Sequence, residues 1–437
     1  MILFYAPRIT NRIKYTASLL LESLCGFQVA YTDKSAEYSN FDGPRINYSQ
    51  IPLSTEEIFV YSHGLLSMKG IKDIQPEVSK DNSLPVFFSG MSDHCFFGFD
   101  IFAAAFYLVS RYEEYLPYKA DIHGRFEAKQ SLAYKNDFLE KPLVNIYAEI
   151  LSEAIKKKFK TAPSKENNYV FIPTYDIDNA YAYLGKGVLR NTGGLIKDLF
   201  SLKFSFFKER ISVLLGRKND PFDTYDFQFE LQKKYDLDTN YFFLAADYGP
   251  YDNNIYVYSR RFDDLVKKVG DYAKVGVHAS YNSFGNYNRL KMEIKRLSKI
   301  ANRPVKKNRM HFLRLKLPDV YRDLIDCNIR KDYTMGYAGH IGFRASICSP
   351  FYFYDIEREQ ITNLKVFPFA VMDTTLKNYM KLGPDNAIKK INKLIDSVKK
   401  VDGTFISLWH NDSLSEQYGW KGWKKVYEHL VHKASTK

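Results

Sequence analysis

The sequence is organised around the stretch Phe171-Ile172-Pro173-Thr174-Tyr175-Asp176-Ile177-Asp178-Asn179. Its apolar first part, together with Tyr169, predicts a buried strand, and two carboxylates one residue apart follow. In α/β folds the loops after the strands carry the chemistry, because they have no packing role. Two acids this close repel each other unless a cation or a proton separates their roles. One could bind a metal while the other accepts a proton; the alternative is an Asx-rich turn.

Strands and helices alternate along the chain after this stretch. This rhythm predicts a parallel α/β sheet, either open or closed into a barrel. The polar residues fall after the carboxyl ends of the strands, as the active face of a barrel requires. Strands are predicted at residues 239–244, 274–277, 309–315, 365–371 and 404–409, and helices at 224–235, 261–272, 288–300, 319–327 and 387–400.

Residues 1–165 predict a smaller α/β domain ahead of the barrel domain, which spans residues 168–437. The charged, aperiodic segment 157–168 separates them as a linker. The role of the first domain stays open between substrate recruitment and partner docking. Its predicted strands are residues 2–5, 27–31 and 85–88, and its predicted helices are 13–24, 100–115 and 142–159.

The net charge of +13 favours an anionic partner. The sequence has no zinc finger, RNA-binding signature or Gly-rich phosphate loop, so nucleic acid is the least favoured partner. The four cysteines form no C-x-x-C pair, which is typical of buried thiols in a reducing compartment. The first residues do not resemble a secretory signal, and there is no run of about 18 apolar residues. We therefore expect a cytoplasmic protein, either free or peripheral to the inner membrane.

Residues 184–218 interrupt the alternation with a long segment that is both basic and apolar. Such a mixture can lie in the interface of an anionic membrane. The alternative is a helical insertion packed on the barrel.

Three histidines fall in or directly after predicted strands: His278 and His410 follow a strand, and His311 lies within one. A divalent metal held by a carboxylate and imidazoles keeps open positions for water and substrate. It lowers the pKa of water and polarises a carbonyl, while a nearby carboxylate and histidine can move protons. These requirements define metal-assisted hydrolysis of an amide or an ester.

The residues from 168 to 415 resemble the NodB-type polysaccharide deacetylases of carbohydrate esterase family four. Thr174-Tyr175-Asp176-Ile177-Asp178 is similar to the first motif of that family, which implies that Asp176 is the catalytic base and Asp178 a metal ligand. His278-Ala279-Ser280-Tyr281-Asn282 is similar to the second motif, His-Ser/Thr-x-x-His. His278 matches the first metal-binding histidine, and Asn282 stands in place of the second.

This departure leaves three alternatives: Asn282 binds the metal weakly, another residue completes the site, or the metal is lost. Arg309-Met310-His311-Phe312-Leu313-Arg314 has the order and spacing of the Arg-containing third motif. We favour His311 as the substitute ligand, with Arg309 or Arg314 orienting Asp176.

Ser407-Leu408-Trp409-His410 resembles the last motif, which implies that His410 is the general acid. Arg344 either clamps a carboxylate or phosphate of the substrate or forms a structural ion pair. Asp373 either orients a catalytic group, contributing to the substrate site, or caps the next turn. Trp409 is expected either to wall the acyl pocket or to fill the core.

The resemblance implies a NodB-like distorted (β/α) barrel and a metal-dependent deacetylase, with zinc as the expected metal and cobalt or nickel as alternatives. The expected substrate is an N- or O-acetylated sugar in bacterial surface-glycan biosynthesis, carried on a lipid or a nucleotide. Two other interpretations remain: a degenerate glycan-binding protein on the same fold, and a hydrolase of non-peptide C–N bonds in a small molecule.

Overall fold

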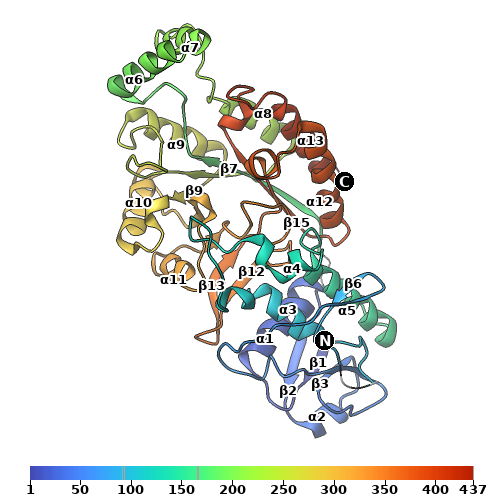
Figure 1. The fold of residues 1–437 in the computed structure, drawn as a ribbon. Helices are drawn as coiled ribbons and strands as arrows, with labels where there is room; N and C mark the ends of the chain where they lie inside the picture. Colours follow the sequence, from blue (N-terminus) through green and yellow to red (C-terminus); the bar gives the residue numbers. More distant parts are fainter. Residues whose placement is uncertain (91, 93, 165–166, 437) are drawn as a thin grey trace.

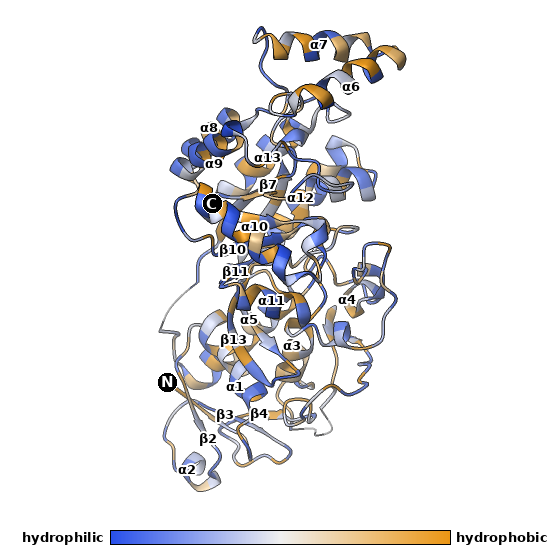
Figure 2. Cartoon of the chain, turned by 90° about the vertical axis from the view of Figure 1, so that its left-hand side faces the viewer, coloured by the Kyte–Doolittle hydropathy of each residue, from blue (hydrophilic) through white to orange (hydrophobic). Residues whose placement is uncertain are grey.

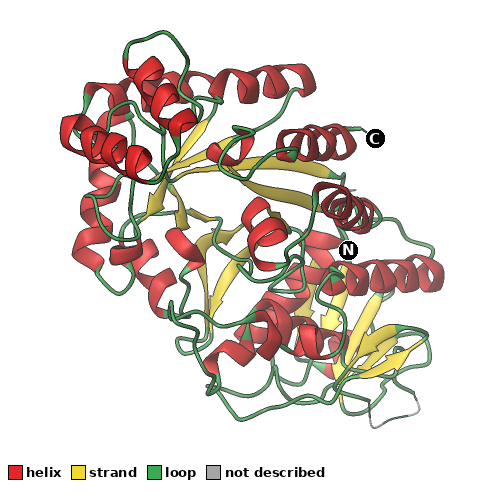
Figure 3. Ribbon diagram, turned by 45° about the horizontal axis from the view of Figure 1, so that its top comes forward, coloured by secondary structure: helices red, strands yellow, loops and turns green. Residues whose placement is uncertain are grey.

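The computed structural model describes residues 1–90, 92, 94–164 and 167–436. Two β-sheets organise the chain, a small one within residues 2–61 and a large one within residues 170–410 (Figure 1). Helices surround the strands of both sheets (Figure 3). The chain is therefore an α/β protein, as predicted. Residues 165 and 166 of the predicted linker lie outside the described residues.

The small sheet is parallel throughout, in the order β2-β1-β3-β4. Its central strands β1 and β3 are largely buried, as expected of a sheet covered on both faces. The strands are β1 (Ile2–Tyr5), β2 (Val29–Thr32), β3 (Arg45–Ser49) and β4 (Ile58–Tyr61).

Helix α3 is apolar on every side and buried along its whole length. Its N-cap Asp100 is also buried and accepts bonds from the backbone N–H groups of Ala103 and His63 and from the Tyr48 hydroxyl, each at 2.8 Å. The helices of this part are α1 (Asn11–Ala17), its continuation in a π-helix (Ser18–Leu24), α2 (Ser35–Ser39), α3 (Ile101–Val109), α4 (Leu132–Lys135) and α5 (Leu143–Phe159); β5 (Ser79–Asp81) and β6 (Leu84–Val86) form a separate hairpin.

The large sheet has the order β12-β13-β11-β10-β9-β8-β7-β15-β14 and is parallel except for the β12–β13 pair. In its registers His410 pairs with Asp176, and Arg309 pairs with His278. The strands are β7 (Val170–Ile177), β8 (Asn240–Phe243), β9 (Lys274–Ala279), β10 (Lys307–Met310), β11 (Lys331–Asp332), β12 (Phe351–Asp355), β13 (Gln360–Val366), β14 (Val371–Met372) and β15 (Thr404–His410).

Backbone hydrogen bonds bend this sheet into a distorted barrel, as predicted. The residues before β14 meet the segment that follows β11: Phe369 N–H donates to Met335 O, and Gly342 N–H donates to Ala370 O. The helices are α6 (Gly187–Phe200), α7 (Phe204–Leu214), α8 (Tyr225–Tyr235), α9 (Arg260–Tyr272), α10 (Tyr287–Ile300), α11 (Asp319–Asp326), α12 (Pro384–Lys399) and α13 (Trp423–Ser435).

The large sheet differs from the sequence prediction in three places. The strand predicted at 309–315 ends at Met310, and a 3₁₀ turn from His311 to Leu313 follows. The strand predicted at 365–371 is divided between the end of β13 and the start of β14. The antiparallel β12–β13 pair was not predicted, because local patterns do not report strand direction.

The two parts of the chain are joined by buried polar contacts. Arg12 forms an ion pair with Glu359 at 2.5 Å, and Arg344 forms one with Glu114 at 2.6 Å. Such contacts hold the small part against the barrel. In the described part of the chain, no helix combines the length and apolar character needed to cross a bilayer.

The buried Asp100 gives a pH-dependent prediction. Burial raises the pKa of Asp100 from 3.8 to about 6, so the folded chain retains a proton in this interval that the unfolded chain loses. The free energy of unfolding of the wild type therefore falls, relative to that of Asp100→Asn, as pH rises through the interval. Urea unfolding of both proteins at about pH 4 and about pH 7 measures the difference. A difference that does not change with pH would contradict this assignment.

Candidate functional site

The site begins at the carboxyl end of β7. Residues two apart in a strand point to the same face, so Asp176 and Asp178 both face the interior of the barrel. Asp176 is buried, whereas the Asp178 side chain is 32% exposed in the wall of a pocket. The two acids of the motif therefore have different environments.

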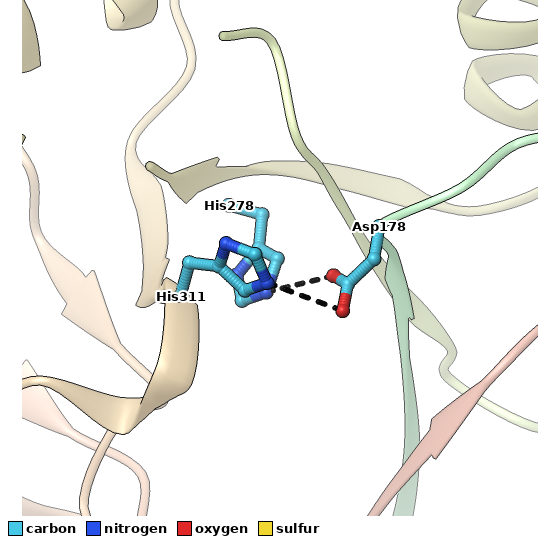
Figure 4. Close-up of side chains that lie close together, drawn as sticks. All are labelled: Asp178, His278 and His311. Atoms are coloured by element: carbon cyan, nitrogen blue, oxygen red, sulfur yellow. Dashed lines mark ion pairs between the residues drawn. The ribbon is translucent and has the colours of Figure 1, made fainter. Parts of the chain in front are cut away.

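Asp178, His278 and His311 form a cluster that could hold a metal ion (Figure 4). One ligand atom from each lies within 4.8 Å of the others. His278 Nε2 lies 3.0 Å from Asp178 Oδ1, and His311 Nε2 lies 3.3 Å from Asp178 Oδ2. The three residues come from the end of β7, from β9 and from the turn after β10.

The partners of the two imidazoles fix which nitrogen faces Asp178. His278 Nδ1 lies 2.9 Å from the carbonyl oxygen of Arg309, which can only accept a hydrogen bond, so Nδ1 carries the proton. His311 Nδ1 lies 2.8 Å from the carboxylate of Asp252 in the same way. Both Nε2 lone pairs are therefore available to a metal, as in carboxylate–histidine–metal sites.

The donor set itself fits a cation. Within the described residues, the buried Oδ1 of Asp178 has no hydrogen-bond partner, although it faces an imidazole nitrogen. Electron-pair donors that face one another need a cation or a proton between them. One carboxylate and two imidazoles form a common ligand set for catalytic zinc.

The electrostatics of the cluster also favour positive charge. Burial opposes the ionisation of Asp178, but the adjacent His311 and His278 outweigh it and hold its pKa well below the usual value. Burial likewise opposes the charge on His311, but Asp178 and Asp252 raise its pKa to about 9. A divalent cation can replace this proton, because metal binding displaces protons from its ligands.

Asp176 is held by a buried arginine. Arg309 Nη1 donates to Asp176 Oδ1 at 2.6 Å, and the same guanidinium donates to Thr174 Oγ1 at 2.8 Å and to the carbonyl of Tyr333 at 2.9 Å. Asp176 Oδ2 remains directed towards the cluster, 3.5 Å from His278 Nε2. Arg309 thus fixes one oxygen of Asp176 and leaves the other facing the pocket.

His410, at the end of β15, lies next to the cluster. Its Nδ1 and its backbone N–H both bond to the carboxylate of Asp373 at 2.8 Å, and its Nε2 lies 3.6 Å from Asp178 Oδ2. Burial disfavours the imidazolium, but Asp373 outweighs it and raises the pKa of His410 well above 6.5. Asp373 therefore orients a proton-carrying histidine.

Three residues considered at the sequence level lie outside this cluster. Arg314 does not reach Asp176, because its guanidinium donates to the backbone carbonyls of His123 and Tyr281 at 2.7 Å. Asn282 is exposed on a 3₁₀ turn. Trp409 points away from the pocket, because it alternates with His410 along β15, and packs against Tyr427 in the core.

Arg344 belongs to a buried ion-pair group and also contributes to the lining of a cavity. It donates to both oxygens of Glu114, at 2.9 and 2.6 Å, and Arg111 donates to the same carboxylate at 2.7 Å. Burial opposes the charge on Glu114, but the two arginines outweigh it and lower its pKa. These contacts are those of the structural ion pair that was one of the two alternatives for Arg344.

The cluster opens into a cavity of about 220 Å³ lined by residues that include Asp176, Asp178, His278, His311 and His410. A second cavity of about 260 Å³ adjoins it and shares part of its lining. Arg125, Leu313, Ala338 and Tyr379 line both cavities.

Sequence reasoning missed two residues that shape this site. Asp252, in the irregular segment between β8 and α9, orients His311. Arg125, from the first part of the chain, donates to the carbonyl oxygen of Phe312 at 2.8 Å. Phe312 and Leu313 have φ values of 58° and 55°, a strained left-handed conformation that Arg125 helps to hold.

The comparisons with known proteins are distant. Residues 2–160 match the model of a family of unknown function, DUF7033. None of the curated proteins matches this chain in sequence.

Among solved structures, a candidate polysaccharide deacetylase from Mycobacterium smegmatis is similar to 63% of this chain over 87% of its own length, with 9% identity and a TM-score of 0.41. An allantoinase is similar to 62% of this chain over 85% of its own, with 10% identity and a TM-score of 0.39. A polysaccharide deacetylase from Bacillus cereus is similar to 61% of this chain over 87% of its own length, with 11% identity and a TM-score of 0.29. These likenesses are coarse, and the site stands on its own residues.

The ligand set predicts how metal binding responds to substitution. His311→Ala removes one of the two imidazoles, so we expect zinc affinity to fall by more than the 10–100-fold typical of losing a residue behind the ligands. Asn282→Ala is the matched control, because Asn282 stands where the second histidine of the family motif would be. We expect it to leave zinc affinity unchanged, since Asn282 is exposed outside the cluster. Equilibrium dialysis with elemental analysis measures both. Equal losses in the two variants would exclude His311 as a ligand.

The buried ion-pair group predicts a stability effect. Glu114→Ala leaves two buried guanidinium groups facing each other, so we expect the free energy of unfolding to fall by about 3–5 kcal/mol. Glu113→Ala, which removes the more exposed neighbouring acid, serves as the control and has a smaller effect. Urea denaturation measures the free energy of unfolding of both variants. An unchanged midpoint for Glu114→Ala would mean that the ion pair of Glu114 with Arg344 does not stabilise the fold.

Proposed function

We propose that this protein is a metal-dependent hydrolase that removes an acetyl group from an N- or O-acetylated sugar. One observation carries the proposal: Asp176 and His410, paired on adjacent strands, line the same pocket as the Asp178-His278-His311 cluster. A base, an acid and a ligand set for a Lewis acid are the groups that hydrolysis of an amide or ester requires.

Asp178, His278 and His311 would hold the ion. Zinc suits one carboxylate and two imidazoles best, and cobalt or nickel accept the same donors. When bound, such an ion lowers the pKa of water towards neutrality and polarises the carbonyl of the substrate.

Asp176 is the proposed general base. Its free Oδ2 faces the cluster, while Arg309 holds its Oδ1, so the carboxylate has one oxygen to accept a proton and one to keep it oriented. Arg309 is a positioning residue, because it is buried behind Asp176 and does not line the pocket.

His410 is the proposed general acid. The bond from its Nδ1 to Asp373 fixes the ring and stabilises the imidazolium, so that Nε2 can donate a proton to the departing amine or alkoxide. A protein that only bound glycans would not need this acid and base pair.

The two adjoining cavities suggest how an acyl sugar would be held. The cavity at the cluster would receive the acyl group, and the second cavity would receive the rest of the substrate. The second cavity is lined by charges of both signs: Arg125 is paired with Asp121, and Lys129 lies in the lining with Glu127. Lys129 would contact a phosphate of a lipid-linked or nucleotide-linked glycan precursor. We propose such a precursor, in the cytoplasmic steps of surface-glycan biosynthesis, as the substrate.

Release of acetate from a panel of N- and O-acetylated sugars tests the proposal. Asp176→Asn and His410→Ala each lower kcat by about 10²–10⁴-fold while retaining the metal, because neither is proposed as a ligand. Asp385→Asn, on the exposed start of α12, is the control for loss of a carboxylate and retains full activity.

Three outcomes would contradict the proposal. Acetate release that persists after the metal is removed would exclude a metal-dependent reaction. Turnover unchanged in Asp176→Asn and His410→Ala would remove these residues from the mechanism. A metal-loaded protein that releases no acetate from any sugar would overturn the proposed substrate class.

A further inference from the structure

We infer that the hairpin formed by α6 and α7 docks on the surface of an anionic membrane. The hairpin is inserted after β7 and stands apart from the body of the barrel in both side views (Figures 1 and 2). Much of it is hydrophobic (Figure 2), and one face of α7 packs on the barrel loops, where Val213 is buried with Tyr183 and Phe222. The packed face includes none of the exposed apolar residues of α6, so a helical insertion packed on the barrel accounts for only part of this segment.

Exposed apolar side chains are the first observation. Leu189 is 89% exposed, Phe200 is 84% and Leu202 is 74%. Soluble proteins rarely expose such side chains together unless they meet a partner or a membrane. The other exposed apolar residues of the segment are Val188, Ile196, Leu199, Phe204, Leu214 and Leu215.

The charge of the hairpin indicates the kind of partner. Residues 184–218 contain eight lysines and arginines but only two acidic residues. Both acids are already paired, Asp198 with Arg210 at 2.9 Å and Glu209 with Lys218. The exposed cations that remain are Lys197, Lys203, Lys208 and Arg217.

Apolar side chains among exposed cations match a bilayer with anionic lipids. The apolar groups enter the boundary between head groups and acyl chains, and the cations bind the lipid phosphates. An uncharged protein surface would cover the apolar groups but leave the cations without an anionic counterpart. The charge therefore favours anionic lipid.

An open groove at the base of the hairpin extends this surface. It has a volume of about 820 Å³ and lies between the start of α6 and residues 246–259. Val188 and Leu189 line one side, and the exposed Tyr248 and Tyr256 line the other. Tyrosine is enriched at membrane interfaces, because its ring is apolar and its hydroxyl is polar.

The base of the hairpin is fixed to the loops at the active face of the barrel. Glu209 accepts bonds from the Tyr183 hydroxyl at 3.2 Å and from the Gln417 amide at 2.9 Å, and Phe206 stacks on Tyr418 at 5.1 Å between ring centroids. These loops follow β7 and β15, the strands that carry Asp176 and His410. Docking of the hairpin would therefore set the position of the active face relative to the membrane. The docking inference does not depend on the proposed reaction.

Vesicle sedimentation of the full-length protein tests the inference. We expect binding to vesicles of phosphatidylglycerol and phosphatidylcholine, weaker binding on addition of salt, and little binding to phosphatidylcholine alone. Phe200→Ser with Leu202→Ser, and separately Lys197→Glu with Lys203→Glu and Lys208→Glu, each lower the affinity by about tenfold or more. All five side chains are exposed, so the variants keep the fold, which circular dichroism checks.

Matched variants elsewhere on the surface serve as controls. Ile51→Ser with Ile361→Ser removes two exposed apolar side chains, and Lys389→Glu with Lys393→Glu and Lys400→Glu makes the same change of charge on and after α12. Both controls bind anionic vesicles like the wild type.

Four results would overturn the inference. These are absence of binding to anionic vesicles, equal binding to neutral vesicles, and equal losses in the hairpin variants and their controls. The fourth is a wild-type dimer that Phe200→Ser with Leu202→Ser converts to a monomer, which would assign the hairpin to self-association. None of these results bears on acetate release, so this inference and the proposed reaction fail separately.

Discussion

Parallel pairing in register is the constraint on which the site depends. The carboxyl ends of parallel strands meet at one edge of a sheet, so residues far apart in sequence become neighbours there. Pairing of β15 with β7 places His410 beside Asp176, and pairing of β10 with β9 places Arg309 beside His278. A shift of either register by one residue would turn these side chains to the opposite face of the sheet.

Each reacting group at this edge has a buried partner that limits what it can do. Arg309 leaves Asp176 only one free oxygen. Asp373 binds Nδ1 of His410, and Asp252 binds Nδ1 of His311, so that each imidazole presents its Nε2 to the pocket. Because these partners lie in a low dielectric, they act more strongly than they would in water. The orientation of the polar groups that line the pocket is therefore set by residues behind them.

The sequence predicted what local pattern and strand order determine. The alternation of strands and helices predicted the α/β class, and acids or histidines at strand ends pointed to Asp176, Asp178, His278 and His410. His311 was favoured as a ligand because of its order along the chain, although it lies in a turn rather than in the predicted strand. Asp252 lies in an irregular segment without periodicity, which explains why no pattern singled it out.

Long-range contacts could not be read from the chain in the same way. The partner of Arg344 is Glu114, 230 residues away, and nothing local distinguishes an arginine that pairs in the core from one that meets a ligand. The same holds for Trp409, because the direction of its side chain depends on which residues of β15 face the pocket. The sequence also could not predict that α6 and α7 project from the barrel, because basic apolar helices can either pack or protrude.

The bond from Arg125 to the Phe312 carbonyl has a mechanical consequence. It ties the first part of the chain to the strained turn that begins with His311, so the position of one ligand is braced from outside the barrel. Removing the first 160 residues would release that brace along with the ion pairs of Arg12 and Glu114. The segments around Arg12, Glu114 and Arg125 therefore support the barrel, which would not keep the same pocket as an isolated fragment.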